Sequence, residues 1–138
     1  MDFSKLPESD IRTAFLEADL IDIGSLKRTA SLSGCPKSGG IYFLFDKHIG
    51  LLYIGQSKNI QRRIESHIYM TQPAIAYFGL EISEFSFILM ENEKKRRDIE
   101  YALIIQHTPY LNKRLQRMKF QLEKENKEAS NAKKTEEL

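Results

Sequence analysis

The stretch that decides the fold is Gly40-Ile41-Tyr42-Phe43-Leu44-Phe45, followed after a polar turn by Leu51-Leu52-Tyr53-Ile54-Gly55. Both runs are rich in β-branched and aromatic residues, which favour β-strands. Between them, Asp46-Lys47-His48-Ile49-Gly50 supplies residues that are typical of turns. The sequence therefore predicts a β-hairpin over residues 40 to 54, with a tyrosine in each strand.

A helix is expected directly after the hairpin. Ser57 or Asn59 can cap it, because the side-chain oxygen of either residue can accept a hydrogen bond from the first free backbone N–H groups. Arg63 and His67 are four residues apart, so they lie on one face of the helix. Hairpin and helix together would bring four polar side chains to one place: Tyr42, Tyr53, Arg63 and His67.

These motifs resemble the GIY-YIG endonuclease family. Gly40-Ile41-Tyr42 and Tyr53-Ile54-Gly55 are its two name motifs. Arg63, ten residues after Tyr53, stands where the family's catalytic arginine is expected, and His67 stands where many members carry a histidine. The resemblance implies an α+β fold with a small three-stranded antiparallel sheet flanked by helices.

A third element of the resemblance lies downstream. The segment 100–112 is similar to the family's last motif, a helix that bears a metal-binding glutamate and is followed by Pro and Asn. Glu100 takes the place of that glutamate, and Asn112 the place of the final asparagine. The resemblance covers about residues 38 to 113. Gly39-Gly40 replaces the family's frequent Pro-Gly, a departure expected to loosen entry into the first strand without touching the chemistry.

The resemblance implies phosphodiester hydrolysis with one Mg²⁺ or Mn²⁺ ion. Glu100, a hard oxygen ligand, would hold the ion, and the planar fork of Arg63 would stabilise the phosphate. Tyr42 or Tyr53 would activate water, with a pKa lowered by the metal and Arg63. His67 could relay or donate a proton. Which tyrosine is the base stays open.

Further residues are expected to bind the DNA substrate. Phosphate neutralisation dominates non-specific DNA affinity, so positive charge near the site is informative. The run 94–97, Lys-Lys-Arg-Arg, is one candidate surface, although such a run also suits a solvated helix face. The substrate-binding residues expected beside the catalytic ones are Gly55, Lys58, Arg62 and Asn112.

Turn residues and changes in composition along the chain predict three parts. They are a helical and loop lead-in over residues 1–38, the nuclease domain over 39–113, and a C-terminal helix with a basic tail over 114–138. The other expected elements are a helix over residues 5–20 with Ile11, Phe15 and Leu16 on one side, a loop over 24–39, a short helix over 72–79, a strand over 84–90 and a helix over 91–106.

The last helix carries Leu111, Leu115, Met118 and Leu122 at helical spacing. It is expected to dock on its own domain, and a contact with a protein partner or a second copy of the chain stays open. Beyond about residue 124 the sequence is too polar to pack. Residues 113 to 138 hold eight Lys or Arg against five Asp or Glu, so the basic excess of the chain lies here.

Composition is compatible with this function and excludes several others. With 138 residues, 41% of them hydrophobic, the chain can bury one core. No apolar run reaches the ~20 residues of a membrane span, so a soluble cytoplasmic protein is expected. Cys35 is the only cysteine, which excludes an intrachain disulfide and a CxxC zinc site.

The sequence is therefore interpreted as a small, metal-dependent DNA endonuclease. Two alternatives stay open. A restriction or homing enzyme would cut at a defined site, and a non-catalytic DNA-binding module would be expected to have lost Arg63 or Glu100. Both residues are present.

Overall fold

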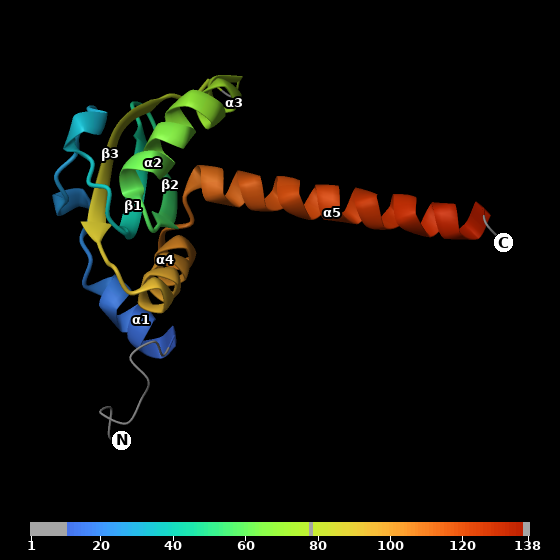
Figure 1. The fold of residues 1–138 in the computed structure, drawn as a ribbon, viewed down its shortest axis with the longest axis horizontal. Helices are drawn as coiled ribbons and strands as arrows, with labels where there is room; N and C mark the ends of the chain where they lie inside the picture. Colours follow the sequence, from blue (N-terminus) through green and yellow to red (C-terminus); the bar gives the residue numbers. More distant parts are fainter. Residues whose placement is uncertain (1–10, 78, 137–138) are drawn as a thin grey trace, which may run out of the picture.

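The computed structural model describes residues 11–77 and 79–136. In the globular part, helices pack around a three-stranded sheet (Figure 1). In chain order the elements are α1 (Ile11–Asp19), the 3₁₀ turns η2 (Ile23–Ser25) and η3 (Leu32–Gly34), β1 (Gly40–Asp46), β2 (Gly50–Ser57), α2 (Ile60–Ser66), the π-helical turn η4 (His67–Thr71), α3 (Gln72–Tyr77), β3 (Ile82–Leu89), α4 (Glu93–His107) and α5 (Tyr110–Glu136).

The strands form one antiparallel sheet in the order β2-β1-β3, so the predicted hairpin and third strand are both confirmed. β1 is the central strand, and all of its residues are buried. Its side chains alternate between the two faces of the sheet. Ile41, Phe43 and Phe45 belong to one hydrophobic cluster, whereas Tyr42 and Leu44 belong to another.

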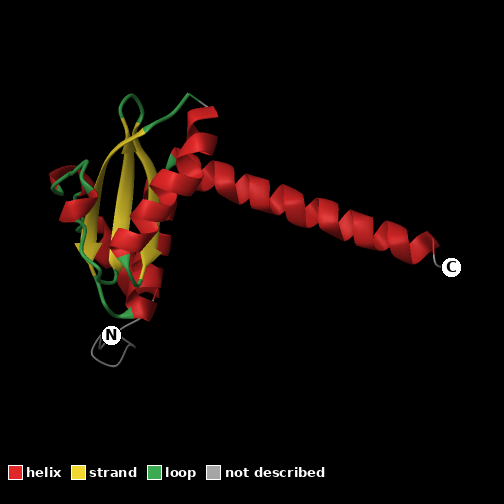
Figure 2. Cartoon of the chain, turned by 45° about the horizontal axis from the view of Figure 1, so that its top comes forward, coloured by secondary structure: helices red, strands yellow, loops and turns green. Residues whose placement is uncertain are grey.

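Helices cover both faces of this sheet (Figure 2). The first cluster includes Ala14 and Ala18 of α1 and Ile99 and Leu103 of α4. The second includes Ile60 and Ile64 of α2. Tyr42 therefore lies on the face of the sheet that α2, the helix after the hairpin, covers.

Local signals explain where the helices begin. The Asn59 side chain accepts a hydrogen bond from the backbone N–H of Arg62, as expected for an N-cap. Asn92 caps α4 in the same way through Lys95. α4 ends at Thr108, which adopts a left-handed conformation with φ of 41° and is followed by Pro109. This turn sends the chain from α4 into α5.

Two expectations about the terminal helices need correction. In α1 the buried residues are Ala14 and Ala18, while Ile11 and Leu16 are 41% and 62% exposed. The part of the predicted helix over residues 5–10 lies outside the described residues. α5 was expected to dock on its own domain, but only its start contacts the sheet, and its remainder projects away (Figure 1). All side chains from 121 to 130 are exposed, because this polar segment has no apolar face to bury.

Within the described residues, none of the helices combines the length and the apolar character needed to cross a membrane.

Candidate active site

The site is built around the pairing of the two name motifs. Tyr42 on β1 lies directly opposite Gly55 on β2. Directly opposed residues on neighbouring strands point to the same face, so the missing side chain of Gly55 leaves room for the Tyr42 ring. A Cβ atom at Gly55 would lie 2.3 Å from both Cζ and the hydroxyl oxygen of Tyr42. Gly55 is buried beneath the ring, and a contact with substrate stays a prediction.

Replacing Gly55 by alanine is expected to lower the free energy of unfolding by about 1–3 kcal/mol, because the new methyl group overlaps the Tyr42 ring. Chemical denaturation measures this change. Gly24→Ala is the matched control, since the nearest atom to its new Cβ is 3.4 Å away. Equal stability changes in the two variants would contradict the packing role assigned to Gly55.

Helix α2 and the π-helical turn after it bring Arg63 and His67 to the same tyrosine. The Tyr42 hydroxyl is 2.8 Å from His67 Nε2, and the Nε–H of Arg63 donates to it at 3.4 Å. The ring of Tyr53 packs beside the rings of Tyr42 and His67, with centroid distances of 6.0 Å and 5.0 Å. The four polar side chains expected to converge do lie together.

Burial sets the protonation of this cluster. It raises the pKa of both tyrosines. The neighbouring Tyr53 further raises the pKa of Tyr42, and the charge of Glu100 further raises the pKa of Tyr53. The expected lowering of the tyrosine pKa is therefore not produced by the protein alone. Burial and the charge of Arg63 lower the pKa of His67 to about 4. His67 is neutral at pH 7, so it lacks the extra proton that an imidazolium donor would carry.

Glu100 approaches the cluster from α4, around the free edge of β2. Its side chain is half-buried, and the backbone N–H of Gln56 donates a hydrogen bond to its carboxylate. Its charge contributes to the raised pKa of Tyr53. Burial raises the pKa of Glu100 to about 7, against the lowering effects of Gln56, Arg97 and Arg96. The positive charges of Arg97 and Arg96 therefore offset the burial of this carboxylate only in part.

The raised pKa predicts an unusual dependence of stability on pH. Between pH 4.5 and about 7 the folded protein keeps a proton on Glu100 that the unfolded chain releases, so this group makes stability fall as pH rises. His67, whose pKa is lowered to about 4, contributes the opposite slope between that pH and 6.5.

In the absence of divalent ions, Glu100→Gln is therefore expected to be more stable than the wild type at pH 8, with the gain disappearing at pH 4.5. Thermal unfolding at both pH values measures this difference. A stability change of the same size at both pH values would show that the ionisation of Glu100 is not its cause.

Asn112 joins α5 to the same strand edge. Its side-chain oxygen accepts from the backbone N–H of Ile54, and its amide nitrogen donates to the Ile54 carbonyl oxygen, both at 2.8 Å. Ile54 lies between Tyr53 and Gly55, so this pairing braces the second name motif from the side. The substrate-binding role expected for Asn112 stays a prediction.

A surface depression of about 400 Å³ adjoins Arg63. Its lining is polar and basic, and it lies along the start of α2. Lys58 and Arg62, the expected substrate-binding residues, are both exposed in it. The depression therefore offers positive charge to an anionic ligand next to the tyrosine cluster. The lining residues are Ser57, Lys58, Asn59, Arg62, Arg63 and Ser66.

The basic run 94–97 differs from the surface that the sequence suggested. Arg96 is buried. The other three side chains form ion pairs within the fold, Lys94 with Asp98, Lys95 with Glu17 and Arg97 with Glu93. Sequence reasoning missed that Arg96 is buried and bonds to Gln56, because nothing local separates Arg96 from its exposed neighbours.

Comparison with known proteins places this arrangement in a family. The UvrC-like GIY-YIG domain family matches residues 38–113. UvrABC system protein C of Microcystis aeruginosa is 36% identical over 80 residues, which cover 56% of this chain and 13% of that protein. The Helicobacter pylori protein of the same name is 36% identical over 93 residues, covering 60% of this chain and 16% of that protein.

The chain is also similar to a solved structure. The magnesium-bound GIY-YIG N-terminal endonuclease domain of UvrC from Thermotoga maritima is 23% identical, with a TM-score of 0.47 over 77% of this chain and 98% of that one. The family match itself spans more than half of the sequence and includes the strands, α2 and α4. This chain belongs to the UvrC-like GIY-YIG domain family.

Proposed function

We propose that this protein is a metal-dependent endonuclease that hydrolyses phosphodiester bonds in DNA. The observation that carries the proposal is the convergence of two tyrosines, an arginine and a histidine beside a basic depression, with a half-buried carboxylate on the neighbouring helix. Family membership supports the same reaction. The site residues are Tyr42, Tyr53, Arg63, His67 and Glu100.

The residues present fit one divalent ion. Glu100 is a half-buried carboxylate whose pKa is raised by burial, and a bound cation would stabilise its charged form. Mg²⁺ commonly binds through one or two carboxylates and keeps several waters. In the described part of the chain no group of three or more His, Cys, Asp or Glu side chains could hold an ion by themselves. Glu100 is therefore proposed to hold a single Mg²⁺ or Mn²⁺ ion that keeps several waters.

When bound, the ion supplies Lewis-acid activation of a phosphate oxygen. Arg63 lies at the rim of the depression, where its guanidinium can contact the same phosphate and stabilise the charge that grows in the transition state. Lys58 and Arg62 in the depression would bind neighbouring phosphates of the strand. These contacts orient the scissile bond next to Tyr42.

Tyr42 is the better candidate for activating water, because its hydroxyl contacts both Arg63 and His67. Its hydroxyl can pass a proton to Nε2 of neutral His67 while its oxygen accepts one from the attacking water. The O–H bond of water breaks, the new O–P bond forms, and the bond between phosphorus and the 3′ oxygen breaks, with the departing 3′ oxygen taking a proton from solvent. Tyr53 packs against the rings of Tyr42 and His67 and holds them in position.

The chain spans only 13% and 16% of the two curated relatives compared above. The choice of target in this protein is therefore a separate question from the chemistry. A DNA substrate is proposed, and partner proteins, or a second copy bound through α5, stay open as means of selecting it.

The proposal is tested by nicking of supercoiled plasmid and of a branched-DNA panel with and without Mg²⁺ or Mn²⁺. We expect cleavage that requires the ion and that disappears with chelator. Binding of DNA with no cleavage under any of these ions would contradict the proposal and favour a binding module. Cleavage at one defined sequence would instead favour a restriction or homing enzyme.

A further inference from the structure

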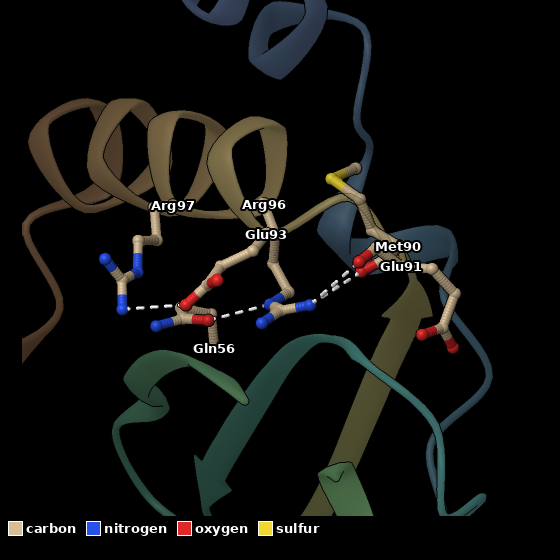
Figure 3. A network of polar contacts seen from close by, with 6 residues as sticks. All are labelled: Gln56, Met90, Glu91, Glu93, Arg96 and Arg97. Carbon is tan, nitrogen blue, oxygen red and sulfur yellow. Dashed lines mark hydrogen bonds and ion pairs between the residues drawn. The ribbon is translucent and has the colours of Figure 1, made fainter. Parts of the chain in front are cut away.

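Arg96 is a buried cation that the proposed chemistry does not use. Its side chain emerges from the first turn of α4, and the residue is only 3% exposed. Its Nε donates to the Gln56 side-chain oxygen at 2.7 Å, and its Nη1 donates to the carbonyl oxygens of Met90 at 3.2 Å and Glu91 at 3.4 Å (Figure 3). These acceptors are all neutral. Burying a charge whose direct hydrogen-bond acceptors are all neutral is costly, so the contacts made by Arg96 call for an explanation.

Gln56 is held from two directions by one helix. Arg96 and Glu100 are four residues apart and share a face of α4. Arg96 bonds to the side chain of Gln56, and the carboxylate of Glu100 accepts from its backbone N–H. Gln56 itself is fixed in β2 by pairing with Ile41 of the central strand.

Side chains from two helices pair with the outer edge of β2. β2 is at the edge of the sheet, so the backbone groups of alternate residues face away from β1. Asn112 occupies those of Ile54, and Glu100 occupies the N–H of Gln56. Two side chains from different helices thus pair with adjacent outward-facing positions on either side of Gly55.

The entry to β1 is shaped around the same guanidinium. A Cβ atom at Gly39 would lie 2.7 Å from Nη1 of Arg96. The backbone N–H of Gly39 also donates to the Glu91 carboxylate at 3.0 Å, a bond that proline could not make. The replacement of Pro-Gly by Gly39-Gly40 therefore ties the strand entry to the β3–α4 connection, in contrast to the loosening expected from sequence.

We infer that Arg96 is a positioning residue for Glu100: by anchoring the start of α4 to Gln56 and to the end of β3, it sets where the carboxylate meets the edge of β2. This inference rests on the proposed function of Glu100 as the metal-binding residue. Residues that orient a metal ligand typically affect metal affinity or activity by ~10–100-fold when they are removed.

Amide hydrogen exchange in metal-free protein tests the geometry directly. In Arg96→Met we expect the Gln56 N–H to exchange at least about 10-fold faster than in the wild type, because its carboxylate acceptor is no longer held. The Ile54 N–H, which bonds to Asn112, should keep its protection and serves as the internal control for an intact fold. Unchanged exchange at Gln56 would overturn the inference.

Mn²⁺ affinity without DNA, followed by electron paramagnetic resonance, gives a second readout. Arg96→Met should bind ~10–100-fold more weakly than the wild type. Arg97→Met is the matched control. It removes an adjacent positive charge that also acts on Glu100, and the Arg97 guanidinium pairs with Glu93 at 2.9 Å. It should stay within about twofold of the wild type. Equal weakening in both variants would show that charge alone matters and would overturn positioning.

Gln56→Met is the second route to the same interaction, should Arg96→Met fail to fold. It removes the acceptor of the Arg96 Nε and keeps the backbone N–H, so the same changes in exchange and Mn²⁺ affinity are expected; wild-type values would overturn the inference. Wild type that binds no Mn²⁺ would refute the proposed metal site, while the exchange result would still decide whether Arg96 positions Glu100.

Discussion

Glu100→Gln is expected to lower the rate of Mg²⁺-dependent DNA cleavage at least about 100-fold, since loss of a direct ligand should exceed the effect of losing a supporting residue. Glutamine keeps the size of the side chain and can still accept the hydrogen bond from the Gln56 N–H. It lacks the negative charge that a divalent ion requires. The variant should therefore fold and bind DNA, and single-turnover cleavage over a series of Mg²⁺ concentrations measures the loss.

Glu93→Gln is the matched control for this experiment. Glu93 lies on the same helix and its carboxylate pairs with Arg97 at the surface, with 64% of either side chain exposed. Exposed ion pairs contribute little to stability, so this variant should cleave like the wild type. Full activity in Glu100→Gln together with loss of activity in Glu93→Gln would show that the assignment of the metal ion to Glu100 is wrong.

The two Glu100→Gln experiments connect function to stability. The same burial that prepares the carboxylate for a cation raises its pKa and destabilises the metal-free protein above pH 7. A variant that gains stability and loses cleavage would show that the site is kept at a cost to the fold. A bound ion is expected to reverse that cost, because it binds the folded state alone.

Several parts of the fold could be predicted because their signals are local. The hairpin over residues 40 to 54 and the helix cap, assigned from sequence to Ser57 or Asn59, follow from neighbouring residues and from the length of one turn. These features also determine where Tyr42, Arg63 and His67 meet, so most of the cluster was accessible from sequence.

The parts that could not be predicted depend on contacts between distant segments. Arg96 stands in a run of four basic residues, and only the packing of α4 against β2 buries it while its neighbours form surface ion pairs. The raised tyrosine pKa has the same origin, since burial outweighs the nearby Arg63. The direction of α5 follows from the backbone turn at Thr108, whose positive φ a β-branched residue rarely adopts.

The second large effect is expected at Arg63. Arg63→Lys keeps the positive charge but loses the planar fork and the Nε–H that donates to Tyr42. If the guanidinium stabilises the transition state, the maximal rate of cleavage should fall about 100- to 1000-fold while the affinity for DNA changes little. Single-turnover rates at saturating DNA, together with equilibrium binding, separate the two quantities.

Arg62→Lys and Arg62→Ala give the contrast, because Arg62 is adjacent in sequence and lines the same depression without a contact to the tyrosines among the interactions described. We expect Arg62→Ala to weaken DNA binding, with a smaller affinity loss in higher salt, and to leave the rate at saturating DNA nearly unchanged. Arg62→Lys, which keeps the charge, should be close to the wild type. If the losses at Arg63 and Arg62 both appeared in affinity alone, Arg63 would be one more phosphate contact, and the transition state would have to be stabilised by other groups.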